Sequence, residues 1–350
     1  MPGVEAILCD RSALDFWRGE SVGEGRTMGY RAALPERRGV VAHDPPSAAT
    51  VEELRTWGLV GADDDVHLLV TSHDARRRVK GLVLHEVTGP LPKDSIVRAK
   101  GTAYAVCPGL LFVMLAARLP LVELLEVGYE LCGTYRMAGE VPSYGLAPLT
   151  SASELRGYAQ RAKGVRGREA ALRAAQWLVD GSGSPAETAL AIAFALPQRL
   201  GGCNLGGFEL NRELELGEGA ARILGRGFVR PDFYWPRARY AAEFDSNAYH
   251  LTPDQADYDE RRRNAYGAEG VGLSIFRTRH LLEPGLFDQM VGAMRRAMGV
   301  RVRGLPDDYD RMHRALLGEA FRYWLDAEDA YDSTEVESRL AAWEGEGAPW

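Results

Sequence analysis

The alternation of hydrophobic and polar positions predicts a mixed α/β protein in both halves of the chain. In the first 150 residues, short apolar runs typical of strands lie at 66–71, 79–87 and 102–106, and helical patterns follow at 108–117 and 121–131. The second half predicts a helix, three strands, a helix, a strand and a helix, in that order, at 184–196, 207–211, 229–235, 240–245, 253–269, 272–277 and 282–298. Strands interleaved with helices in this way are typical of a sheet flanked by helices.

Breaks in the pattern predict two domains. A Gly-Ser-Gly-Ser run at 181–184 is typical of a flexible joint, and the stretch before it is helical and rich in arginine. With 350 residues, the chain is long enough for two hydrophobic cores. We expect an N-terminal α/β domain at 1–150, a basic helical linker at 151–183, a second domain at 184–300 and an acidic, helix-prone extension at 301–350.

Acidic residues gather on two neighbouring predicted strands. Asp232 lies in the run 229–235, and Glu243 and Asp245 lie in the next run, where alternation places them on one face. Antiparallel pairing of the two runs would bring the three carboxylates together. Such a group is costly unless a cation neutralises it, and Mg²⁺ prefers oxygen ligands. The alternatives are that Asp232 begins or ends a strand and that Asp245 is a turn residue.

Two further residues could act beside these acids. Glu187 follows Ser184 and Pro185 at the start of a predicted helix, where a glutamate can simply cap the helix. His250 follows Asp245 by five residues. An imidazole titrates near pH ~6.5 and can carry a proton at neutral pH, although an ordinary loop histidine explains this residue equally well.

Basic residues on the predicted helix 253–269 are candidates for contacts with nucleic acid. Arg261, Arg262 and Arg263 are consecutive, so they cannot all face one partner. Asp259 lies three residues before Arg262, and an intrahelical ion pair is the alternative to a phosphate contact. The arginine-rich helix 156–173 could hold a DNA backbone or form a solvated face. The small basic cluster at 73–78 could also contact nucleic acid.

In the order of these motifs, residues 184–300 resemble the restriction-endonuclease-like, or PD-(D/E)XK, nuclease superfamily, and within it the very-short-patch repair endonucleases and DUF559 domains. Six pieces carry the resemblance: Ser184-Pro185-Ala186-Glu187, Arg230-Pro231-Asp232-Phe233, Glu243-Phe244-Asp245-Ser246, Tyr249-His250, the helix with Asp259, Arg262 and Gly270, and Ser274-Ile275-Phe276-Arg277-Thr278. The first 150 residues faintly resemble the N-terminal modules of AbiEi-type antitoxin and DUF559 proteins.

The resemblance implies a two-domain α/β protein whose C-terminal restriction-endonuclease-like mixed sheet is flanked by helices. It further implies a Mg²⁺-dependent DNA endonuclease, with Mn²⁺ as a second candidate ion. Asp232, Glu243 and Asp245 would hold the metal, and Glu187 would be the helix-borne acid. His250 would transfer protons. Arg262, with Arg261 or Arg263, would contact DNA.

One departure from the superfamily pattern favours another function. The second motif is usually acid-x-Lys, whereas this chain has Glu243-x-Asp245 and no lysine after Lys163. No lysine of this region can therefore orient the attacking water. The alternatives are a non-catalytic nucleic-acid-binding or toxin–antitoxin-type regulator on the same fold, and a domain that uses the fold for protein contacts.

Composition narrows these functions only slightly. The net charge of −7 argues against a protein that coats polyanions generally, but it leaves room for a local basic groove. The four cysteines have no metal-ligand spacing, which favours a reducing cytoplasm. No signal peptide is evident, and the longest apolar stretches are too short to span a bilayer. We expect a cytoplasmic protein with no membrane partner.

Overall fold

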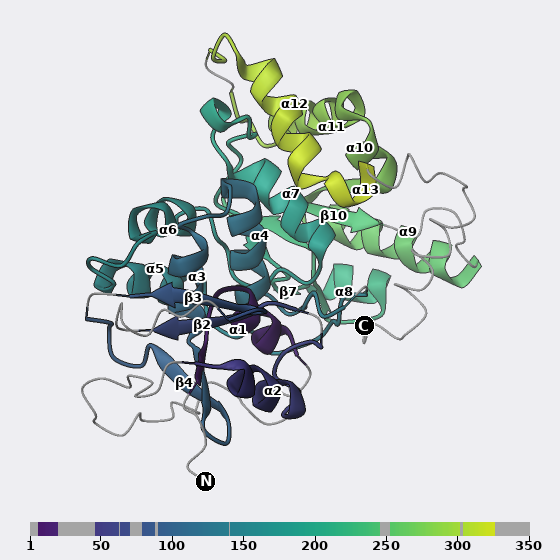
Figure 1. Cartoon of the computed structure of the whole chain (residues 1–350). Coiled ribbons are helices and arrows are strands. Elements are labelled where there is room, and N and C mark those ends of the chain that lie inside the picture. Colours follow the sequence, from purple (N-terminus) through teal and green to yellow (C-terminus); the bar gives the residue numbers. More distant parts are fainter. Residues whose placement is uncertain are drawn as a thin grey trace. The chain divides into compact units, whose positions relative to one another are not determined.

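The computed structural model describes residues 6–19, 46–62, 64–70, 79–87, 90–139, 141–245, 253–301 and 304–325. The chain divides into two compact units, Met1–Leu178 and Val179–Trp350. Each unit contains both helices and strands (Figure 1), so the expected mixed α/β class is confirmed. Within the described residues, no helix combines the length and the apolar composition that a membrane span requires.

The first unit contains a five-stranded mixed sheet with the order β3-β2-β1-β5-β4. Strand β1 is parallel to β5 and antiparallel to β2, and β2 is parallel to β3. Strands β1, β2 and β5 are buried along their whole length, which agrees with their apolar composition, in which His67 of β2 is the exception. The strands are β1 (Ala6–Leu8), β2 (Val66–Val70), β3 (Leu82–Glu86), β4 (Ile96–Lys100) and β5 (Ala103–Val106).

The helices of the first unit include two that the sequence assigned to a linker. They are α1 (Asp10–Arg18), α2 (Ala48–Thr56), α3 (Pro108–Leu115), α4 (Leu121–Cys132), α5 (Ala152–Arg161) and α6 (Arg168–Ala175). Helix α5 packs closely on α3 at Gly109. A Cβ at this glycine of α3 would lie only 2.5 Å from Cγ of Tyr158 in α5, so no larger side chain fits there. Leu155 and Ala171 are also buried. The stretch 151–178 is therefore part of the first unit, because its apolar face packs there.

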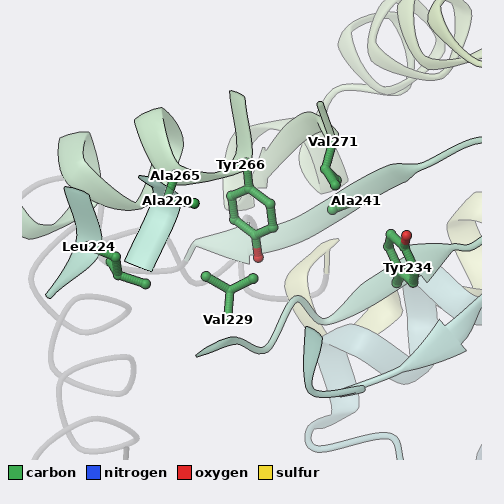
Figure 2. Close-up of a cluster of buried hydrophobic side chains, with 8 residues drawn as sticks. All are labelled: Ala220, Leu224, Val229, Tyr234, Ala241, Ala265, Tyr266 and Val271. Carbon is green, nitrogen blue, oxygen red and sulfur yellow. The ribbon is translucent and has the colours of Figure 1, made fainter. Parts of the chain in front are cut away.

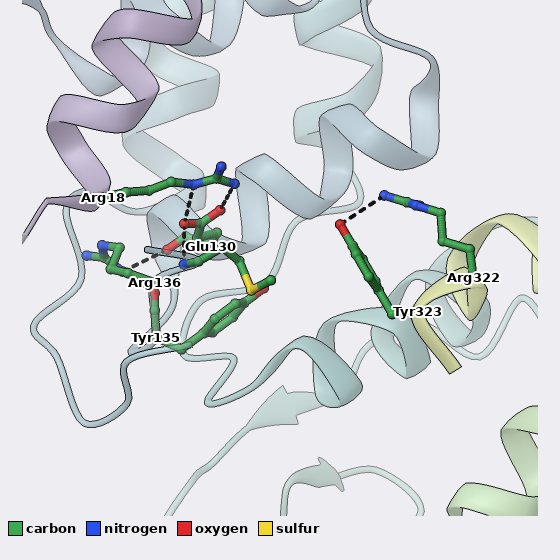
Figure 3. Close-up of polar contacts among 7 residues, drawn as sticks. Arg18, Glu130, Tyr135, Arg136, Arg322 and Tyr323 are labelled. Atoms are coloured by element: carbon green, nitrogen blue, oxygen red, sulfur yellow. Dashed lines mark hydrogen bonds and ion pairs between the residues drawn. The ribbon is translucent and has the colours of Figure 1, made fainter. Parts of the chain in front are cut away.

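A buried carboxylate connects two of these helices. Glu130 of α4 accepts hydrogen bonds from Nε and Nη2 of Arg18 in α1, at 2.9 and 2.6 Å (Figure 3). The backbone N–H of Met137 donates to the same carboxylate at 2.9 Å. Arg136 donates to the backbone carbonyl of Glu130 at 2.9 Å. These charge-assisted bonds compensate for the burial of Glu130 and fix α1 against α4.

The second unit contains a four-stranded sheet with the order β11-β10-β9-β6. Strand β10 is antiparallel to β9 and parallel to β11. The antiparallel pairing expected for the two acidic strands is therefore confirmed. The elements are α7 (Pro185–Ala195), β6 (Glu209–Leu210), β7 (Leu214–Glu215), α8 (Glu218–Leu224), β8 (Phe228–Val229), β9 (Phe233–Trp235), β10 (Tyr240–Asp245), α9 (Pro253–Ala268), β11 (Gly272–Arg277), α10 (Thr278–Leu282), α11 (Pro284–Ala297), α12 (Tyr309–Ala320) and α13 (Arg322–Leu325), with a 3₁₀ turn at Gln198–Leu200.

The prediction of one continuous strand at 229–235 is wrong, because this run is divided. Residues 230–232 separate two short strands, β8 and β9, that belong to different sheets, because β8 pairs with β7. Pro231 has no N–H to donate to a strand ladder, which favours a break at this point. The break leaves Asp232 in a connecting segment at the start of β9.

Aromatic packing holds α7 against the sheet. Every residue of α7 is buried, and its Phe194 ring lies 5.2 Å from the Phe233 ring and 5.4 Å from the Phe276 ring between centroids. Phe287 of α11 joins the same group. This burial on all sides explains why α7 has an apolar rather than an amphipathic sequence.

A second buried cluster joins α9 to the sheet (Figure 2). Tyr266 of α9 is 1 % exposed and lies among Val229, Ala241 and Ala265. Ala241 shares a face of β10 with Glu243 and Asp245 because strand side chains alternate. The two acids therefore lie on the face of β10 that α9 covers.

The described part of the expected acidic extension contributes to the core of the second unit. Leu316, Leu317 and Phe321 are buried, and α12 contacts α7. His313 is also buried and bonds to Asp288 at 2.8 Å. Residues 326–350 of this extension lie outside the described residues. As far as it is described, the extension forms helices, and α12 packs into the core.

Candidate functional site

Asp232 connects the two central strands of the second sheet. The side chain is half-buried, and its Oδ2 accepts a hydrogen bond from the backbone N–H of Phe244 at 2.6 Å. The backbone carbonyl of Asp232 accepts from the N–H of Asn211 at 3.1 Å. The carboxylate is thus fixed beside β10, one residue from Glu243.

Glu243 lies in the interior of the unit and has two partners on α9. Its side chain is 5 % exposed, and its Oε1 accepts a hydrogen bond from the Tyr266 hydroxyl at 2.7 Å. Its Oε2 lies 2.6 Å from Nη2 of Arg262, although the angles do not make this contact a good hydrogen bond. One buried oxygen of Glu243 is therefore held by an ion pair that lacks good hydrogen-bond geometry.

Glu187 caps its own helix, as one interpretation of the sequence expected. Its N–H donates to Oγ of Ser184 at 3.2 Å, and Oγ donates in return to the Glu187 carboxylate at 3.0 Å. The same carboxylate accepts from the N–H of Gly183 at 2.8 Å and from the side chain of Asn211. Asn211 thus joins Glu187 to the backbone of Asp232.

Burial raises the pKa of all three carboxyl groups. For Asp232, the nearby Glu187 and Glu243 raise the pKa further, so that it stands well above its ordinary value. For Glu243, Arg262 and Tyr266 oppose the effect of burial without cancelling it. For Glu187, the hydrogen bonds from Gly183, Asn211 and Ser184 lower the pKa without cancelling the effect of burial. In all three groups the cost of burying the charge exceeds what the partners recover, which favours a proton or a cation there.

Asp245 faces a different partner. It is level with Arg277 in the parallel pair β10–β11, and its Oδ2 lies 3.6 Å from Nε of Arg277. Its negative charge still contributes to the raised pKa of Glu243. Asp245 is thus near enough to act on Glu243, while its own carboxylate is directed toward Arg277.

The three arginines of α9 have separate surroundings. Arg262 pairs with Glu243 and also lies 3.8 Å from Asp259, the intrahelical pair that the spacing suggested. Arg261 pairs with Asp257 at 2.9 Å, and Arg263 is exposed. Of the three, Arg262 is the one that reaches the acidic cluster.

Some of the expected functional residues lie outside the part of the chain that the structure describes. His250 lies outside the described residues, together with Ser246 and Tyr249 of the same motifs. The basic cluster expected at 73–78 lies outside them as well.

A further group of candidate ligands occurs in the first unit, where no site was expected. Asp10, His67 and His85 each offer one atom, and these three atoms all lie within 4.8 Å of one another. Among the described residues, this is the one group of three or more acidic, histidine or cysteine side chains that meets this distance. The structure thus provides a possible metal-binding cluster of carboxylate and imidazole groups.

The sequence could not reveal this cluster through spacing. His67 and His85 are 18 residues apart and become neighbours only because β2 and β3 pair in parallel. Burial lowers the pKa of both histidines, which favours the neutral imidazole that can act as a ligand. A histidine in an apolar strand is the only signal, and such a histidine is more often a structural residue.

Comparisons with protein-family models, with curated proteins and with solved structures found no match.

Proposed function

We propose that the second unit is a Mg²⁺-dependent phosphodiester hydrolase that acts on DNA, with a restriction-endonuclease-like fold. The observation that carries the proposal is the proximity of Asp232, just before β9, to Glu243 of β10: Asp232 accepts a hydrogen bond from the N–H of Phe244, and both pKa values are raised by burial and by other carboxylates. The order of α7, β6, β9, β10, α9 and β11 supports it, because the sequence resemblance implies helices and strands in this order.

The residues of this cluster suit a hard divalent cation. Asp232 and Glu243 offer carboxylate oxygens, which are the ligands that Mg²⁺ prefers. The buried Oε2 of Glu243 lacks a good hydrogen bond and has a lone pair to give. Asp232 and Glu243 would hold the ion, Asp245 would complete the carboxylate set, and Glu187 would add negative charge from α7. A bound ion would polarise a phosphoryl oxygen and lower the pKa of its water.

Arg262 has a second role in this proposal. In the structure described, its guanidinium neutralises Glu243. When Glu243 binds a cation, this ion pair weakens, and the guanidinium is then available to a phosphate oxygen at the same place. Arg262 would therefore hold the DNA backbone in the state that has bound metal, while Arg261 and Arg263 would add contacts from the surface.

The proton carrier must be a group other than lysine, since no lysine follows Lys163. His250 follows the end of β10 in the sequence, and an imidazole can accept a proton from water or donate one to a leaving oxygen. We assign this role to His250.

The second candidate function is a non-catalytic nucleic-acid-binding or toxin–antitoxin-type regulator. The ion pair between Glu243 and Arg262 supports it, because this pair neutralises the carboxylate without any metal. The missing lysine favours it too.

A cleavage assay tests the two functions. Supercoiled, linear duplex and single-stranded DNA would be incubated with the full-length protein and Mg²⁺ or Mn²⁺. We expect cleavage by the wild type, and we expect Asp232→Asn to lose both cleavage and the rise in melting temperature that Mg²⁺ produces. The matched control is Asp308→Asn, which removes an exposed carboxylate paired with Arg311. DNA binding without cleavage under every condition would favour the regulator.

A further inference from the structure

We propose that the first unit binds a divalent transition-metal ion through Asp10, His67 and His85. The site would be separate from the acidic cluster of the second unit and would differ from it in chemistry. The proposal does not depend on nuclease activity.

One atom of each side chain lies within 4.8 Å of one atom of each of the other two, so the three groups are close enough to share one ion. Nδ1 of His67 lies 3.5 Å from Oδ1 of Asp10 and 2.8 Å from Nε2 of His85. The other ring nitrogen of His85, Nδ1, lies 3.9 Å from Oδ2 of Asp10, and only one of the two nitrogens would bind the ion. Ligands at ~2.0–2.2 Å from one Zn²⁺ ion lie roughly 3–4 Å apart, so a small movement of the imidazoles would suffice.

The backbone holds two of these ligands in place. The N–H of His67 donates to Oγ of Ser12 at 2.9 Å, and its carbonyl accepts from the N–H of Cys9 at 3.0 Å. These bonds join β2 to the residues on either side of Asp10. Asp10 itself has a φ of 53°, in the left-handed region that few residues other than glycine adopt. A conformation of this kind persists where the surroundings enforce it, and such positions are frequent at functional sites.

Asp10 also has partners that orient its carboxylate. Oδ1 accepts from the backbone N–H of Arg11 at 2.7 Å and from the guanidinium of Arg118. Metal-binding carboxylates usually have such hydrogen-bonding partners. The positive charge of Arg118 opposes a cation, so it lowers the affinity while it holds Asp10 in position. Oδ2 remains directed toward His85.

The donor set selects the class of ion. Two imidazoles and one carboxylate suit Zn²⁺, Fe²⁺ and Co²⁺, whereas Mg²⁺ prefers oxygen ligands alone. Three protein ligands leave at least one position for water. The His85 side chain is 21 % exposed, which provides access from solvent, while Asp10 is almost completely buried.

The alternative is a hydrogen-bonded cluster that holds no ion. In that case Arg118 neutralises Asp10, and one imidazole donates to the other. The two possibilities predict different responses to metal, because a hydrogen-bonded cluster has no specific affinity for Zn²⁺ or Co²⁺.

Metal titration of the full-length protein, stripped with a chelator, tests the proposal. We expect the wild type to bind Zn²⁺ at this site. His85→Gln should bind the same ion about 100-fold more weakly, so that under the conditions that load the wild type it holds one Zn²⁺ fewer. His85 lies on β3, an edge strand, so the variant should fold. Circular dichroism would verify this, and Asp10→Asn provides an independent variant. The matched control is His280→Gln, which removes a buried histidine of the second unit and should keep the ion.

Spectroscopy identifies the ligands directly. Co²⁺ should give d–d absorption typical of four- or five-coordinate nitrogen and oxygen ligation, and X-ray absorption of the Zn²⁺ form should show two imidazoles. Equal Zn²⁺ binding by wild type and His85→Gln, or a bound ion without imidazole scattering, would overturn the proposal. Asp232→Asn should retain this ion, so a failure here is distinguishable from a failure of the nuclease proposal.

Discussion

Glu243 of β10 and Arg262 of α9 form an ion pair of 2.6 Å in which the carboxylate side chain is 5 % exposed and the guanidinium side chain 31 %. The pair joins the central acidic strand to the helix that covers it. Because Glu243 is almost completely buried, its charge depends on this partner and on Tyr266.

Removal of the guanidinium should destabilise the second unit. Arg262→Met leaves Glu243 buried with a single hydrogen-bond donor, and we expect a loss of about 2–3 kcal/mol. This is less than for a fully buried pair because Arg262 is partly exposed. Urea unfolding measures the loss, and Arg263→Met, at an exposed neighbouring position, should change stability by less than about 0.5 kcal/mol. If Mg²⁺ binds at Glu243, it should restore part of the loss; equal losses in the two variants would contradict the role of the pair.

The raised pKa values predict how stability depends on pH. The pKa values of Asp232, Glu187 and Glu243 are higher in the folded protein than in the unfolded chain, so the folded state retains protons that the unfolded state has released. Without divalent ions, stability should therefore fall as pH rises from about 4 through the raised values.

Asp232→Asn tests this pH dependence. The amide can still accept from the N–H of Phe244, while the like charge disappears. We expect a flatter pH profile and a gain of roughly 1–2 kcal/mol at pH 7 in a chelator. Urea midpoints between pH 4 and pH 8 give the answer, with Asp308→Asn as the control. A variant less stable than the wild type at pH 7 would show that the charge of Asp232 is already compensated.

The hydroxyl of Tyr266 should contribute more to the stability of the fold as Glu243 becomes ionised. Tyr266→Phe preserves the packing seen in Figure 2 but removes the donor to Oε1 of Glu243. We expect a loss of about 1–2 kcal/mol at pH 8 and a smaller loss at pH 4, where a protonated Glu243 needs the donor less. Tyr323→Phe serves as the comparison, because Tyr323 is 56 % exposed and should show little effect at either pH. A loss that does not vary with pH would indicate a role in packing alone.

His250 can be separated from the metal ligands by two measurements on one variant. If it carries a proton, His250→Ala should slow DNA cleavage by ~10²- to 10⁴-fold and leave the stabilisation by Mg²⁺ nearly intact. Asp232→Asn should lose both. Unchanged cleavage by His250→Ala would make His250 an ordinary loop residue and leave proton transfer to a carboxylate or to water.

Much of the secondary structure could be predicted because it depends on neighbours in the sequence. The apolar runs correctly placed β2, β3, β10 and β11, and the alternation along β10 correctly placed Glu243 and Asp245 on one face. The cap formed by Ser184 and Glu187 was equally visible, since its hydrogen bonds join residues three positions apart. Periodicity, capping and alternation are local properties, so the sequence alone determined them.

Tertiary structure decided which of these residues meet. The spacing suggested Asp259 as a partner of Arg262 but could not reveal Glu243, because that contact depends on how α9 packs on β10. Likewise, nothing local brings His67 to His85; the parallel pairing of β2 with β3 does so. Such contacts arise from strand register and helix packing, which the whole core determines together.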